Sequence, residues 1–193
     1  MPRAGLTEDR VVGEAETMAD EVGLRQVTLA ALAGRLGVRQ PSLYKHIDSM
    51  DGLQRSIAVR AKRELADVAG RAAIGRSRQE AVRALCHAYR TWALEHPGRY
   101  AATVRAPAPD DPEDLAASAA AVEVVFGVLS GYGLAGEAAV DATRAIRASL
   151  HGFLALETGG GFGLPQDVSG SFDRLVDGLV AALEAGSFDR TRG

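Results

Sequence analysis

The sequence has little of what several classes of protein require. Cys86 is its only cysteine, which excludes an internal disulfide and an all-cysteine metal site. Cys86 and His87 are neighbours that diverge on a helix, and no CxxC or HxxxH pair occurs, so we expect no metal and no cofactor. GxSxG, HExxH and P-loop motifs are also absent, and we therefore do not expect an enzyme.

Long hydrophobic runs and a secretion signal are missing as well. The N-terminal stretch MPRAGLTEDRVVGEAE turns acidic within a few residues and lacks the apolar core of a secretory signal. The most apolar window, residues 115–136, consists mostly of small residues and has Glu123 in its middle, whereas a membrane span needs about 20 strongly apolar residues. We expect a cytoplasmic protein without a membrane partner.

Strand signals are almost absent, whereas apolar residues recur at helical spacing throughout, so the pattern predicts an all-α fold of about nine helices. Thr7 and Thr28 can cap the first two helices, and a third, short helix begins at residues 40–42. A fourth helix, capped by Asp48 or Ser49, runs to about residue 70. Further helices are expected at about 77–96, 98–106, 112–130, 136–157 and 168–185.

The glycine-rich stretch GGGFGLP, residues 159–165, is typical of a phosphate-binding loop only where a strand precedes it, and none is predicted there. We expect a flexible connection between two helices.

The net charge of −3 hides a local excess of basic residues. Residues 25–63 carry eight basic and two acidic side chains, whereas residues 64–193 carry 12 basic and 17 acidic ones. The basic segment is therefore a candidate surface for a polyanion.

Residues 28–47 have the layout of a helix-turn-helix. Gly37 tolerates positive φ in the turn, and Ala33, four positions earlier, is small enough for two helices to cross closely. Apolar side chains occupy the positions that must pack between the helices, namely Leu32, Leu36, Val38 and Leu43.

The segment GVRQPSLYKHI, residues 37–47, places DNA-reading donors on the second helix of this layout. Its start would meet base edges in a major groove, where Arg39 can pair with guanine and Gln40 with adenine. The side chains that follow suit a thymine methyl group or phosphates, and Thr28 with the positive end of its helix offers a further phosphate site. The predicted DNA contacts are Thr28, Arg39, Gln40, Pro41, Ser42, Tyr44, Lys45 and His46.

The motif VTLAALAGRLGVRQPSLYKHIDSMDGL, residues 27–53, resembles the DNA-binding region of the TetR family of bacterial transcriptional repressors. The resemblance covers about the first 65 residues. It implies a helix-turn-helix domain at residues 1–50, a connecting helix at 51–70 and a C-terminal ligand-binding and dimerisation domain at 71–193. The family usually has a lysine where this chain has Met50, so either that phosphate contact is lost or a neighbour such as Arg55 supplies it.

The C-terminal part resembles a TetR subset with a Trp-x-x-x-His-Gly motif. His151 and Gly152 match the motif, Arg147 stands in place of the tryptophan, and HPGRY, residues 96–100, is also similar. Six side chains are candidates for an effector pocket, although residues of this kind are more often part of a core: Tyr89, Trp92, Tyr100, Phe126, His151 and Phe153.

The last predicted helix carries an apolar stripe wide enough for two contacts, formed by Phe172, Leu175, Val176, Leu179, Val180 and Leu183. With helix 136–157 it could build a four-helix dimer interface, as in the TetR family; the alternative is a purely internal core.

Together these features predict a homodimeric repressor that binds a palindromic operator on double-stranded DNA and releases it when a small organic effector binds. The alternative is an all-helical small-molecule-binding protein or enzyme with a vestigial DNA-binding domain. The basic segment with its intact reading helix favours the repressor.

Overall fold

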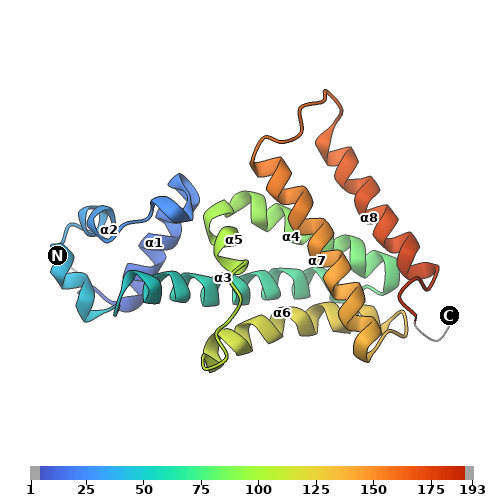
Figure 1. Cartoon of the computed structure of the whole chain (residues 1–193), viewed down its shortest axis with the longest axis horizontal. Coiled ribbons are helices and arrows are strands. Elements are labelled where there is room, and N and C mark those ends of the chain that lie inside the picture. Colours follow the sequence, from blue (N-terminus) through green and yellow to red (C-terminus); the bar gives the residue numbers. More distant parts are fainter. Residues whose placement is uncertain (1–4, 190–193) are drawn as a thin grey trace. The chain divides into compact units, whose positions relative to one another are not determined.

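The structure is a computed structural model that describes residues 5–189. Over this range it contains helices and no strand, which confirms the predicted all-α fold (Figure 1). Two short 3₁₀ helices accompany the α-helices. The elements are α1 (Glu8–Val22), η1 (Leu24–Gln26), α2 (Leu29–Leu36), η2 (Gln40–Lys45), α3 (Met50–Ala73), α4 (Arg78–Glu95), α5 (Pro97–Thr103), α6 (Pro112–Ser130), α7 (Gly136–Thr158) and α8 (Val168–Glu184).

The first helices begin at the residues that the sequence predicts. The Thr7 hydroxyl accepts the Arg10 N–H at 3.2 Å, and the Thr28 hydroxyl accepts the Ala31 N–H at the same distance. Each bond satisfies an amide that has no partner within its helix. Of the two caps proposed for α3, Ser49 makes the bond, accepting the Gly52 N–H at 3.0 Å.

The third helix begins within the predicted residues 40–42 and is a 3₁₀ helix. Residues 40–45 form the 3₁₀ helix η2, in which the Ser42 N–H donates to the Arg39 carbonyl at 2.8 Å and the His46 N–H to that of Leu43 at 2.8 Å. Pro41 has no N–H to donate, and the chain turns again at Ser49, so the tighter helix fits the short span. Three residues complete each turn, which aligns Ser42 with Lys45 and Pro41 with Tyr44.

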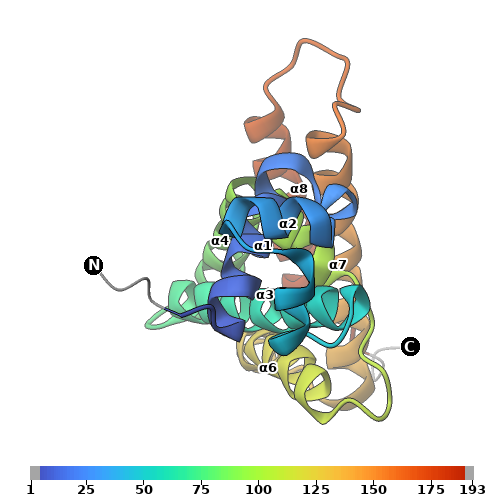
Figure 2. The ribbon, with the colours of Figure 1, turned by 90° about the vertical axis from the view of Figure 1, so that its left-hand side faces the viewer.

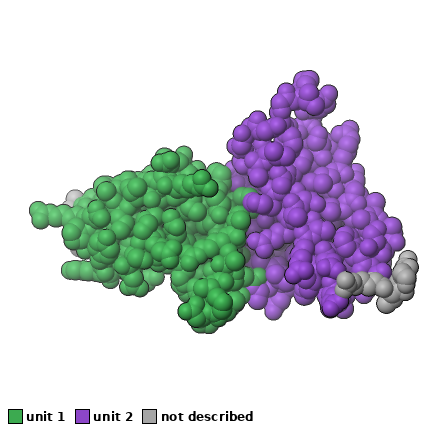
Figure 3. Space-filling view, in the orientation of Figure 1, with its two compact units in different colours: residues 1–63, 95–118 green, residues 64–94, 119–193 purple. Residues whose placement is uncertain are grey.

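The described chain divides into two compact units (Figure 3). The first holds residues 5–63 and 95–118, and the second holds residues 64–94 and 119–189. The units therefore do not follow the linear order of the chain, because α5 and the start of α6 return to the first unit.

The first unit has a core of apolar side chains from α1, α2, η2, α3 and α5. Phe and Trp are absent from this cluster, and close packing of aliphatic side chains takes their place. Its fully buried members include Val11, Ala15, Leu32, Leu43, Leu53 and Ile57.

The second unit is built around α4, α7 and α8 with parts of α3 and α6. On α8 the large apolar side chains Phe172, Val176, Val180 and Leu183 are buried in this core, and Leu175 and Leu179 pack against it. The stripe on the last helix thus serves the interior of its own chain, which was one of the two alternatives.

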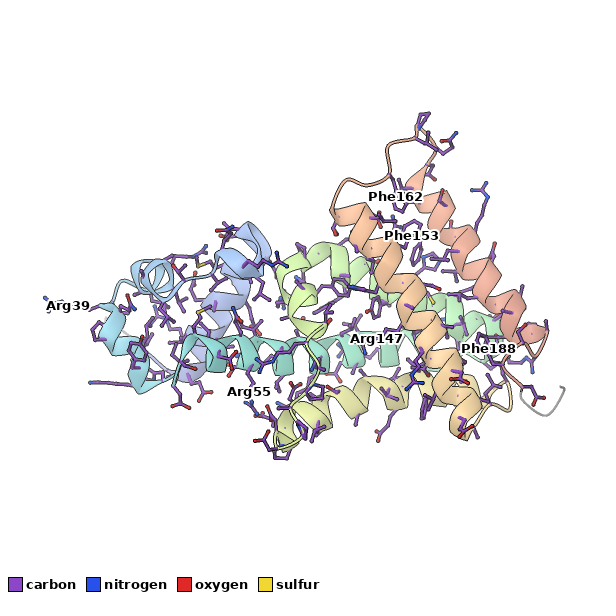
Figure 4. The ribbon with its side chains drawn as sticks, in the orientation of Figure 1. Arg39, Arg55, Arg147, Phe153, Phe162 and Phe188 are labelled. Carbon is purple, nitrogen blue, oxygen red and sulfur yellow. The ribbon has the colours of Figure 1, made fainter. Side chains whose placement is uncertain are left out.

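Residues 159–167 connect α7 to α8, as predicted, and the start of this connection contacts α7. The Gly161 N–H donates to the Leu156 carbonyl at 2.7 Å, and the Phe162 ring packs on Phe153 with centroids 4.8 Å apart (Figure 4). The Asp167 carboxylate ends the connection by accepting the Ser169 and Gly170 amides at the start of α8.

Among residues 5–189, no helix is both long enough and apolar enough to cross a membrane.

Candidate nucleic-acid interface

Residues 37–47, the reading segment, are anchored by two apolar side chains and present polar ones to solvent. Leu43 is fully buried and Ile47 nearly so, whereas Tyr44 is 52% exposed. Figure 2 shows α2 and this segment together in front of α1, and Figure 4 shows Arg39 extended away from the ribbon. A helix with one buried side and one row of exposed donors has the form of a groove-reading element.

The placement of the eight predicted DNA contacts follows this division. Ser42 and His46 are half-buried at the edge of the segment. The other six are exposed, namely Thr28, Arg39, Gln40, Pro41, Tyr44 and Lys45.

Ion pairs fix α2, the first helix of the motif, against α1. Arg35 lies at 2.6 Å from Glu14 and forms a second pair with Glu21, so one guanidinium joins two positions on α1. Hydrogen bonding to Arg35 lowers the pKa of Glu21, and both carboxylates raise the pKa of Arg35. Ala33 of α2 is buried in the core of the first unit.

The basic segment 25–63 is less positive than its composition indicates. Five of its eight basic side chains pair with carboxylates of the first unit, namely Arg35, Arg55, Arg60, Lys62 and Arg63. Arg25, Arg39 and Lys45 make no ion pair within the described residues. The charge that remains for a polyanion is therefore concentrated in residues 25–47, which contain no acidic residue.

Arg55 is not available to replace the missing lysine at Met50. Its Nε lies 2.5 Å from Asp111 and its Nη2 lies 3.0 Å from Glu113. Hydrogen bonding to Arg55 lowers the pKa of Asp111 to about 2. The Met50 side chain is half-buried and packs against the core, so neither Met50 nor the ion-paired Arg55 places an unpaired cation here.

The sequence analysis did not identify the acidic partners of the basic side chains on α3. The stretch DDPED, residues 110–114, indicated a break between helices, but it also supplies Asp111, Glu113 and Asp114 to the basic side of α3. The opposite charge of the two stretches was the available signal.

The structure distributes the six predicted effector-pocket residues over both units. Tyr89, Phe126 and Phe153 pack against the same core cluster of the second unit. Trp92 is buried on α4 and His151 is half-buried on α7, also in this unit, whereas Tyr100 is buried in the first unit. A pocket formed by all six within one unit is therefore absent from the described residues, and the effector role of each stays a prediction.

The second unit carries a hollow of about 350 Å³ elsewhere, between the end of α3, the start of α4 and the end of α6. It is lined by Ile74, Arg76, Ser77, Glu123 and Gly127, among others.

Cys86 is buried in this unit, and burial raises the pKa of its thiol to about 12, so the thiolate that metals and electrophiles require is disfavoured.

A helix-turn-helix that presents unpaired cations on an exposed reading segment defines a DNA-binding regulator. The comparisons with known proteins agree with this class. Residues 82–179 match the family described as tetracyclin repressor-like, C-terminal domain. The chain belongs to the TetR family of transcriptional regulators.

Three relatives illustrate the likeness. The chain is 39% identical to the uncharacterized HTH-type transcriptional regulator Rv0681 of Mycobacterium tuberculosis, over 97% of this chain and 84% of that protein. It is 34% identical to the corresponding regulator YobS of Bacillus subtilis, over 94% and 95% of the two chains. A TetR variant from Acinetobacter baumannii, crystallised with minocycline, has the same fold with a TM-score of 0.72 and 22% identity over 94% of this chain and 98% of that one.

Proposed function

We propose that this chain is a cytoplasmic, homodimeric repressor whose two reading segments bind a palindromic operator. Arg39 and Gln40 read base edges from the start of η2, while Thr28, Tyr44 and Lys45 contact phosphates. Pro41 and Ser42 lie against a thymine methyl group, and His46 contacts the groove wall.

The observation that carries this proposal is the contrast within the reading segment. Leu43 and Ile47 fix the segment to the core, so the backbone position of Arg39 and Lys45 is defined, yet neither cation has an acidic partner in the described part of the chain. Exposed cations without partners are available for phosphates, because no internal ion pair must be broken on binding.

The outward faces of α7 and α8 support a dimer. Ala148, Gly152 and Ala155 are exposed on one side of α7, and Gly178 and Ala181 on one side of α8. A Cβ built on either glycine would meet nothing within 4 Å. Small side chains allow close approach of helices from a second copy, while the large apolar residues of α8 remain in their own core.

A small organic effector that binds the second unit would release the operator by changing the separation of the two reading segments. Binding of a dimer to two half-sites is joint, so a shift of a few Å removes much of the affinity. The solved relative from Acinetobacter baumannii binds minocycline. That a protein of the same fold binds a small organic molecule is the basis of this part of the proposal.

Selection from random duplexes with the purified protein tests the proposal. We expect a palindrome whose half-sites lie about one helical turn, roughly 34 Å, apart, bound by two chains. Sedimentation of the complex gives the number of chains. Failure to enrich any sequence would instead favour the alternative of a binding protein with a vestigial reading domain.

A further inference from the structure

Residues 95–118, called the collar here, fold with the helix-turn-helix although residues 64–94 intervene in the sequence. The collar comprises α5, the connection that follows it and the start of α6. Ala102 of α5 is buried in the same cluster as Val11, Ala15 and Leu43. The collar is therefore part of the core that supports the reading segment.

The collar contacts α1 through a close approach of the two backbones and through hydrogen bonds, and this contact is called the α1 joint here. A Cβ at Gly98 would lie 2.0 Å from the Ala19 carbonyl oxygen, so only glycine lets α5 approach the α1 backbone this closely. Asp20 accepts the backbone N–H of Arg99 at 2.9 Å and its Nε–H at 2.8 Å. Two hydrogen bonds between these residues thus fix α5 on α1, the helix to which Arg35 also ties α2.

A second joint links the collar to α3. Lys62 Nζ lies 2.6 Å from Asp114 Oδ1, and the two side chains are only 6% and 2% exposed. Asp111, which pairs with Arg55, also accepts the backbone N–H of Asp114 at 3.1 Å, so the Asp111 side chain fixes the backbone of Asp114 at the start of α6.

A buried ion pair is a costly way to hold two helices together. Desolvation of both charges offsets most of their attraction, and apolar side chains of similar volume are often as stable. An ion pair tolerates little displacement, however, because a shift leaves a buried charge without its partner. The Lys62–Asp114 pair therefore specifies one position of the collar on α3 more than it adds stability.

Both ends of the collar continue into the second unit. Helix α4 ends at Glu95, where the collar begins, and α6 runs on beyond residue 118. Together with α3, these are the covalent connections between the first unit, called the reading unit here, and the rest of the described chain.

We propose that the collar is the positioning element of the reading unit. The α1 joint, formed by Gly98, Asp20 and Arg99, and the α3 joint, formed by Lys62 and Asp114, hold α1 and α3 in the arrangement that sets the separation of the two reading segments on an operator. The inference rests on the proposed function, since it requires a dimer that docks on two half-sites. Arg99, Asp20, Lys62 and Asp114 are positioning residues that touch no DNA.

The affinities of each variant for two DNA duplexes distinguish a role in positioning the reading segments from a role in folding. One is the palindrome selected with the wild-type protein, and the other retains one half-site and has the second scrambled. The variants are Arg99→Ala at the α1 joint and the double change Lys62→Met with Asp114→Leu at the α3 joint, which removes both buried charges and keeps the volume apolar. We expect each to weaken binding to the palindrome by about tenfold or more, because joint docking is lost. Binding to the single half-site should change by less than about twofold, because one reading segment docks on its own.

Arg90→Ala is the matched control. Its ion pair with Glu157 in the second unit has side-chain exposures of 15% and 16%, close to the 18% and 15% of Arg99 and Asp20. The control should leave the ratio of the two affinities unchanged. Equal losses on both duplexes would overturn the inference, because the joints would then serve only the fold, and so would unchanged affinities or a ratio that falls equally in the control. If the wild-type protein enriches no palindrome, the proposed function itself fails, which is a separate result.

Discussion

Two groups of basic side chains in the first unit look alike in sequence and differ in structure. Arg39 and Lys45 on the reading segment are exposed and have no acidic partner in the described residues, whereas Arg55, Lys62 and Arg63 on α3 each face a carboxylate of the stretch 110–114. The net charge of a sequence segment therefore indicates a DNA-binding surface only when the cations that pair with carboxylates of the same chain are left out of the count. The first group is available to a ligand, and the second holds the fold together.

The largest expected effect lies in the second group. Lys62→Met keeps the apolar stem and leaves the Asp114 carboxylate buried without its partner, so the free energy of unfolding should fall by about 3–5 kcal/mol. Chemical denaturation measures this loss. Adding Asp114→Leu should restore most of the stability, and a double variant as unstable as the single one would contradict the assignment of the cost to an unpaired charge.

Substitutions in the first group should weaken DNA binding and leave the stability of the fold nearly unchanged. Arg39→Ala should cost about 1–3 kcal/mol of operator affinity and relax base preference at one position of each half-site. Stability should change by less than about 0.5 kcal/mol, because the side chain is exposed. Binding profiles over all single-base variants of the operator test the first point. Identical profiles for both proteins would exclude Arg39 as a base-reading residue.

Salt dependence sharpens the comparison between one cation of each group. Lys45→Ala should reduce the slope of log affinity against log salt by about 1, because one phosphate contact is lost. Arg63→Ala removes a similarly exposed cation that pairs with Glu113 at 3.1 Å, and it should leave the slope unaltered. Equal slopes in the two variants would mean that pairing does not separate the groups.

The smallest effect concerns the pH dependence of stability. The pKa of Asp111 is lowered from 3.8 to about 2 by Arg55, so the carboxylate is stabilised in the folded state. This contribution is fully present above about pH 4 and is lost as the pH falls through 2. The difference in melting temperature between wild type and Asp111→Asn should therefore shrink as the pH is lowered from 5 to 2.5. A constant difference would indicate that the pair contributes through shape and not through charge.

The sequence predicted those features that depend on local interactions. The caps at Thr7 and Thr28 and the turn at Gly37 follow from hydrogen bonds between residues three or four positions apart, so spacing alone locates them. The fold class followed from the periodicity of apolar residues in the same way.

Features that depend on distant pairing were beyond the sequence. Asp20 and Arg99 are separated by 79 positions and Lys62 and Asp114 by 52. Opposite charge indicates that such stretches can meet, but no local pattern says which residues pair. The same holds for Tyr100, which follows α4 in the chain but lies in the first unit. The 3₁₀ form of η2 was missed because a proline in the first turn is compatible with either kind of helix.

The buried thiol of Cys86 has a practical consequence for studies of motion. Because this thiol is both buried and protonated, a cysteine introduced at an exposed position such as Ser171 would be the only one that a spin label or fluorophore modifies. Distances between the two labels of a dimer could then be followed during operator release without first removing a native cysteine.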